Sequence, residues 1–149
     1  MTEQQSSVGV NVLIMGDLLT DGSYPIIDES SGGSLRGMIE AIEKLLRLVN
    51  ADTVVVPGHG AIGNRQTLLG FRDMPRAIEV RIQSLIASKS SVAEIIAAAP
   101  TSDFDGVWGR GYVTGDIFVR MVPAGLGLTA KTREQVRSTQ IPCNLEFGD

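Results

Sequence analysis

The shortage of predicted strands constrains the fold of this 149-residue chain more than any other feature. Residues 8–15 (VGVNVLIM) and residues 52–56 (DTVVV) are predicted to form short buried strands, and we expect Gly16-Asp17 to end the first. Their alternation with helical segments predicts an α/β domain. Two or three strands are few for a complete domain of this class, which indicates that part of a sheet is missing.

Apolar spacing predicts the two longest helices. Residues 34–49 carry one apolar stripe at helical spacing, and Ser34 is a suitable N-cap. Residues 64–87 repeat the helical pattern. Pro75 interrupts this second segment, so we expect it to kink the helix or to start a new one capped by Asp73.

The remaining C-terminal signals are shorter. Ser91 and Glu94 have the spacing of a capping box at the start of a short helix. Residues 114–121 predict a last helix. We assign residues 1–126 to a single α/β domain and expect residues 127–149, which lack a stable period, to form a loosely ordered tail.

The chain's charge and composition exclude several classes of partner. Its 13 basic and 17 acidic side chains give a net charge of −4 without a basic stripe, so we expect no nucleic-acid partner. The apolar runs are shorter than the ~20 residues that cross a bilayer, and we expect no membrane association. The single cysteine, Cys143, and the polar N-terminal residues without a signal-peptide pattern favour a cytoplasmic location.

Asp17 and His59 are the first candidates for chemistry. Each follows an apolar run beside glycine, and His59 is the sole histidine of the chain. Sites in α/β folds gather at the carboxyl ends of strands, where a carboxylate and an imidazole are suitable zinc ligands. Spacing alone favours a plainer interpretation, in which Asp17 caps a turn and His59 is a hydrogen-bonded loop residue.

Several separate motifs then carry a family resemblance. They are NVLIMGDLL at 11–19, GSYPIID at 22–28, GGS at 32–34 and PGHG at 57–60, followed by Asp103-Phe104-Asp105 and Trp108-Gly109. In this order and spacing, residues 11–122 resemble the C-terminal half of a metallo-β-lactamase-fold hydrolase. The resemblance implies half of an αββα sandwich, with a small sheet and covering helices.

The resemblance also implies roles for the two candidate ligands. Asp17 stands where the family has an aspartate bridging two metal ions, and His59 stands where a histidine binds one of them. The implied reaction is hydrolysis by a metal-held water. The family's His-x-His-x-Asp-His motif and one further histidine are absent from this sequence. We therefore expect a truncated domain with an incomplete zinc site, inactive alone and requiring a homodimer partner or a complementing N-terminal half.

Three further residues have two interpretations each. Tyr24 fits either the substrate side of the cleft or an aromatic packed at the edge of the core. Asp28 fits a residue that binds substrate or orients a loop, but a solvated turn carboxylate is the interpretation that we favour. Trp108 is expected to pack between helices rather than to support a ligand.

Two other functions compete with the incomplete hydrolase. The first is a non-catalytic α/β module for partner binding or self-association. The second is a metal-free enzyme that uses Asp17 and His59 as general base and orienting group. Half of a sandwich would leave one sheet face bare, and Leu13, Met15, Val54 and Val56 are the predicted members of that face.

Overall fold

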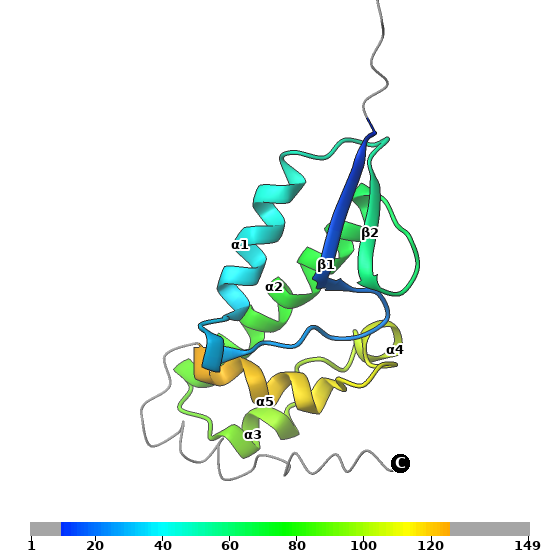
Figure 1. Cartoon of the computed structure of the whole chain (residues 1–149). Coiled ribbons are helices and arrows are strands. Elements are labelled where there is room, and N and C mark those ends of the chain that lie inside the picture. Colours follow the sequence, from blue (N-terminus) through cyan, green and yellow to red (C-terminus); the bar gives the residue numbers. More distant parts are fainter. Residues whose placement is uncertain (1–9, 126–149) are drawn as a thin grey trace, which may run out of the picture.

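A computed structural model describes residues 10–125 as a mixed α/β fold with a two-stranded parallel sheet and five α-helices (Figure 1). The strand–helix alternation expected from the sequence is confirmed. The predicted tail at 127–149, with Cys143, lies outside the described residues. In chain order the elements are β1 (Val12–Thr20), a 3₁₀ turn η1 (Glu29–Ser31), α1 (Leu35–Leu46), β2 (Val54–His59), α2 (Arg65–Ala87), α3 (Val92–Ala97), α4 (Asp105–Trp108) and α5 (Gly115–Gly125).

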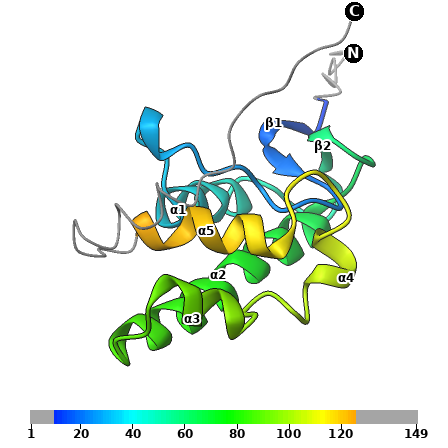
Figure 2. The same ribbon diagram turned by 90° about the horizontal axis from the view of Figure 1, so that it is seen from below.

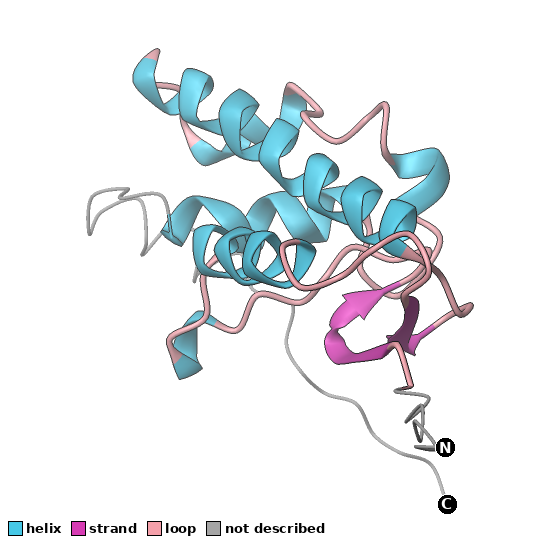
Figure 3. Cartoon of the chain, turned by 90° about the horizontal axis from the view of Figure 1, so that it is seen from above, coloured by secondary structure: helices cyan, strands magenta, loops and turns pink. Residues whose placement is uncertain are grey.

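The helices gather on one side of the sheet (Figure 3). Because side chains alternate along a strand, one face of each strand meets the helices and the other does not. Val55 is fully buried on the helical side, whereas Ile14 is 76% exposed on the outer side. The register pairs Val12 with Val54 and Ile14 with Val56, which places these four side chains together on the outer face.

The predicted composition of the bare face was therefore half wrong. Leu13 is partly buried and Met15 is buried, and both belong to the hydrophobic core. Val54 does lie on the outer face, at 40% exposure. Residues 12–15 of β1 are all apolar. Without alternating polar residues, the sequence does not indicate which alternate side chains of the strand face the helices.

Both strands extend further than expected. Gly16-Asp17 does not end β1, which continues to Thr20, and β2 continues from Val56 to His59. Gly16 adopts φ +53°, and the register shifts on both sides of it. This bulge lets the strand bend and resume pairing, because glycine tolerates positive φ.

The two long helices are confirmed, and of the two alternatives at Pro75 the start of a new helix is wrong. Ser34 caps α1 through a bond from the Gly37 amide, as expected. α2 is a single helix from Arg65 to Ala87 that contains Pro75, so no second helix starts there. The Asn64 side chain caps α2, and Asp73, the expected cap, pairs instead with Arg72.

Burial explains why α2 continues through Pro75. Phe71, Met74, Pro75 and Ile78 are all buried along this helix. One missing backbone hydrogen bond costs less than exposing that face, since most helical stability in proteins comes from tertiary packing.

The C-terminal helices complete the core. The Ser91–Glu94 capping box is confirmed at the start of α3. α5 packs against α3 and α1, and Figure 2 shows it between these two helices. It runs from Gly115 to Gly125, past the predicted end at residue 121.

Trp108 serves packing, as expected, with its ring edge-to-face on Phe71 at 5.5 Å. It lies in α4, a short helix that the sequence did not predict. None of the described helices has the length and apolarity needed to cross a membrane.

Candidate metal and substrate cavity

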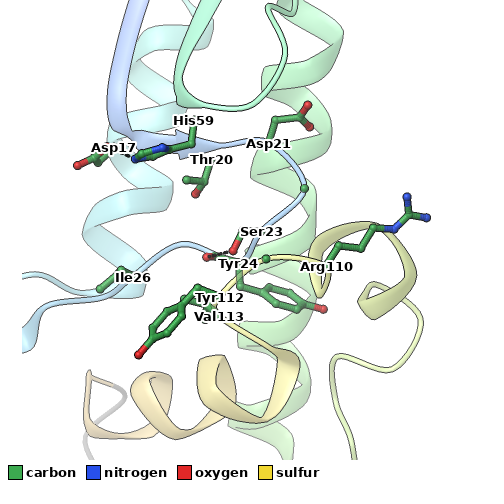
Figure 4. A pocket seen from close by; sticks show the side chains of 12 residues that line it. Asp17, Thr20, Asp21, Ser23, Tyr24, Ile26, His59, Arg110, Tyr112 and Val113 are labelled. Carbon is green, nitrogen blue, oxygen red and sulfur yellow. Dashed lines mark hydrogen bonds and ion pairs between the residues drawn. The ribbon is translucent and has the colours of Figure 1, made fainter. Parts of the chain in front are cut away.

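The fold brings the two predicted ligands together. His59 Nε2 lies 3.3 Å from Asp17 Oδ1, and both side chains are largely exposed (Figure 4). Asp17 follows the bulge in β1, and His59 is the last residue of β2, in register with Thr20. Asp17 lies within its strand rather than after it, but the expected meeting of carboxylate and imidazole near the carboxyl ends of parallel strands is present.

Glycine at position 58 makes this approach possible. A Cβ there would lie 2.6 Å from the backbone of Gly16 and 2.7 Å from Asp17 Oδ1. Both distances are shorter than van der Waals contact allows, so a larger residue would push the strands apart. The Asp21 amide also donates to the His59 carbonyl at 2.9 Å, which holds the loop after β1 against the end of β2.

Asp17 and His59 open onto a cavity of about 810 Å³. Its lining comes from the end of β1 and the following loop, from His59, and from residues 110–113. This volume lies within the range of small-molecule sites. The cavity therefore has two walls. The first lies at the ends of β1 and β2 and includes the His59 imidazole, and the second is formed by residues 110–113.

The second wall is fixed by close backbone contact. Gly109 forms an isolated bridge with Ser23, and a Cβ at Gly111 would lie 2.5 Å from the Ser23 side chain. Val113 is buried beneath this loop. Residues 110–113 are therefore held against the β1–α1 connection, although about 90 positions separate the two segments in the sequence.

Among the described residues, Arg110 is the one arginine or lysine that lines the cavity. Its Nε donates to the Gly106 carbonyl at 2.5 Å, and no carboxylate of the described residues lies within ion-pair distance of its guanidinium. Tyr112 and Ile26 line the same cavity with exposed fractions of 78% and 70%. No local motif marks Arg110 or Tyr112 as site residues, and Ile26 lies in the GSYPIID motif at 22–28 without a role of its own in the sequence predictions.

Tyr24 borders the cavity but belongs mainly to the core. Its ring is 1% exposed and stacks on Phe118 at 5.0 Å. Its hydroxyl donates to Asp105 Oδ1 at 2.7 Å and to the Thr101 carbonyl at 3.3 Å. Burial, and next the bond to Asp105, raise the pKa of Tyr24 well above its ordinary value. Tyr24 is therefore an aromatic residue packed at the edge of the core, which was one of its two interpretations. A role in substrate binding stays a prediction.

Asp28 lies away from the cavity lining. Its carboxylate caps η1 and accepts bonds from the hydroxyls and amides of Ser30 and Ser31. The hydroxyl bond from Ser30, followed by that from Ser31, lowers the pKa of Asp28. This geometry is that of a turn carboxylate, and its proposed contact with substrate stays a prediction.

The metal-ligand set is small within the described part of the chain. No three His, Cys, Asp or Glu side chains among residues 10–125 are grouped closely enough to hold a metal ion. Asp17 and His59 alone fall short of the three protein ligands typical of catalytic zinc. Comparison with known protein families, curated proteins and solved structures finds no match to this chain.

Proposed function

We propose that this protein is an incomplete metal-dependent hydrolase domain of the metallo-β-lactamase type, in which Asp17 and His59 supply part of a zinc site. One observation carries the proposal: the two side chains come from different strands and approach to 3.3 Å at the edge of a cavity. Two ligands of a tetrahedral zinc ion, each near 2.0–2.2 Å from the metal, lie about 3.3–3.6 Å apart. The observed separation fits a shared ion.

We propose that a second chain supplies the ligands that Asp17 and His59 do not provide. Asp17 and His59 do not make a catalytic zinc centre by themselves, so we expect no hydrolysis by the isolated chain. The bare outer face of the sheet, which includes Val12 and Ile14, supports association, because parallel sheets are normally covered on both faces. We propose a homodimer or a complex with a complementing N-terminal half as the functional form. A homodimer would bring two copies of each ligand, four in total.

Metal analysis tests this function. We expect protein purified without chelator to hold roughly one zinc ion for every two chains when a homodimer shares the site. His59→Ala and Asp17→Asn should each lose this zinc. Asp52→Asn removes an exposed carboxylate far from the cavity and should keep it. Equal zinc contents in the wild type and His59→Ala would refute the metal role of His59.

A non-catalytic α/β module for binding or self-association is the second candidate. The same exposed sheet face favours it, because that face offers an interface whether or not a metal binds. Coexpression with an N-terminal half that carries the family's histidine motif separates the two. Zinc-dependent hydrolysis by the complex, lost in His59→Ala, supports the incomplete hydrolase, whereas a stable complex without activity supports the module.

A further inference from the structure

Arg110 gives the cavity a positive charge away from the proposed ligands. In Figure 4 its side chain lies on the opposite side of the view from Asp17. The bond from Nε to the Gly106 carbonyl anchors the guanidinium and leaves its two terminal nitrogens available. Arg110, like Arg47, Arg65 and Arg120, forms no ion pair with a carboxylate of the described residues, whereas four other arginines do. A planar guanidinium in this state is suited to bind a carboxylate through two hydrogen bonds.

The rim of the cavity on the Asp17 side is apolar. Ile26 and Tyr112 are both large, both mostly exposed, and both line the cavity. Figure 4 shows them on the same side of the view as Asp17. Exposed apolar side chains beside a few polar groups are typical of small-molecule sites. This rim suits the apolar body of a ligand rather than its charged end.

Asp17 adds to the difference in charge between the two sides of the cavity. Its exposed carboxylate lies on the side of Figure 4 opposite Arg110, whereas the exposed carboxylate of Asp21 lies on the same side as Arg110. An anionic group is repelled from the Asp17 side and stabilised beside Arg110. A ligand that carries a carboxylate therefore has one favourable orientation in the cavity.

We propose that the cavity binds a small organic acid, with its carboxylate on Arg110 and its apolar body between Ile26 and Tyr112. This orientation directs the other end of the ligand toward Asp17 and His59. The identification of this acid as a substrate rests on the proposed function, but its binding does not. Arg110 and Tyr112 are then the residues that determine specificity.

Binding of two matched probes tests the proposal. Phenylacetate carries a carboxylate and an aromatic body, and phenylacetamide replaces the charge with a neutral amide of nearly the same shape. Each is titrated into metal-free, ¹⁵N-labelled full-length protein and followed by amide NMR. We expect phenylacetate to shift amides at 20–24 and 110–113, with phenylacetamide about tenfold weaker.

Two variants locate the charge that is responsible. Arg110→Gln should weaken phenylacetate about tenfold and leave phenylacetamide unchanged. Arg47→Gln removes an exposed arginine at the end of α1, outside the cavity, and should change neither. Equal binding of the two probes to the wild type, an equal loss in Arg47→Gln, or no binding of phenylacetate would overturn the proposal.

The apolar rim and the metal are tested separately. Tyr112→Ser should lower the affinity of both probes by the same factor, because it removes contact with their aromatic body. Unchanged affinity would contradict the proposed role of Tyr112 in the apolar rim. If the wild type binds phenylacetate through Arg110 and zinc content does not depend on His59, the zinc proposal fails while the organic-acid site stands.

Discussion

At the scale of single residues, the cavity depends on contacts that only particular side chains permit. Gly58 lets β2 approach Asp17, and Gly111 lets residues 110–113 pack on Ser23. Tyr24 joins the loop after β1 to Asp105 through its buried hydroxyl. These residues therefore set how closely the segments around the cavity approach one another.

Tyr24→Phe tests whether the Tyr24 hydroxyl serves stability. We expect it to lower the free energy of unfolding by about 1–2 kcal/mol, because Asp105 Oδ1 loses its donor while the ring stack on Phe118 remains. Tyr112→Phe alters an exposed hydroxyl and should change stability little. Urea unfolding measures both, and equal stability of the two variants would argue against the structural role.

Thr20 gives a prediction of the opposite sign. Its hydroxyl oxygen is buried without a hydrogen-bond partner among the described residues. Replacement by valine keeps the shape and removes the unsatisfied polar group, so Thr20→Val should leave stability unchanged or raise it by up to about 1–2 kcal/mol. Thr20→Ser, which keeps the hydroxyl and loses the methyl group, should be less stable than the wild type. A clear loss of stability in Thr20→Val would mean that the hydroxyl has a partner.

At the scale of elements, α1, α2 and α3 each begin at a side-chain cap. Asn64 caps α2 and Ser91 caps α3, each with a reciprocal bond that completes a capping box. In the second box, the Ser91 amide and hydroxyl donate to Glu94 Oε2 at 2.7 and 2.8 Å. The amide bond first, and then the hydroxyl bond, lower the pKa of Glu94.

This cap makes a small part of the stability of α3 dependent on pH. Because the pKa of Glu94 is lower in the folded chain, the contribution is fully present above the ordinary glutamate pKa and is lost as pH falls through the folded value. We expect carboxyl NMR titration to give a Glu94 midpoint below the ordinary range, and Ser91→Ala to raise it. Ser90→Ala, at the neighbouring position, should leave it in place. An unchanged midpoint in Ser91→Ala would contradict the capping bond.

At the scale of the whole molecule, the described helices cover one face of the sheet and leave the other exposed among residues 10–125. The helical layer buries Val55 and Met15, while the opposite face presents Val12 and Ile14. A parallel sheet with an open apolar face is unusual, since crossover helices normally cover both faces. We propose that a second copy of the chain covers this face.

Ile14→Lys tests the interface that this arrangement implies. We expect the wild type to be a dimer by light scattering and Ile14→Lys to be a monomer, because a lysine buried without a partner is costly. Leu48→Lys alters a side chain of nearly equal exposure, 79% against 76%, away from the sheet, and should remain dimeric. A monomeric wild type at micromolar concentration would exclude this interface.

The parts of the fold that depend on local signals could be predicted from the sequence. The start of α1 at Ser34, the capping box of α3 and the two strands all follow from residues within a few positions of each other. The choice of Asp17 and His59 rests on the family resemblance, because their spacing alone favours a turn cap and a loop residue. The structure places the two side chains 3.3 Å apart, and their role as metal ligands stays a prediction.

Tertiary structure alone decided the rest. The continuation of α2 through Pro75, and the burial of Met15 instead of Ile14, depend on which surfaces the helices cover. The cavity wall that carries Arg110 depends on contacts with residues far away in the chain. Local sequence determines the periodicity and the caps of each element, because those interactions span only a few residues. Which faces meet is determined by the free energy of burying apolar surface between distant segments, and no single segment encodes that energy.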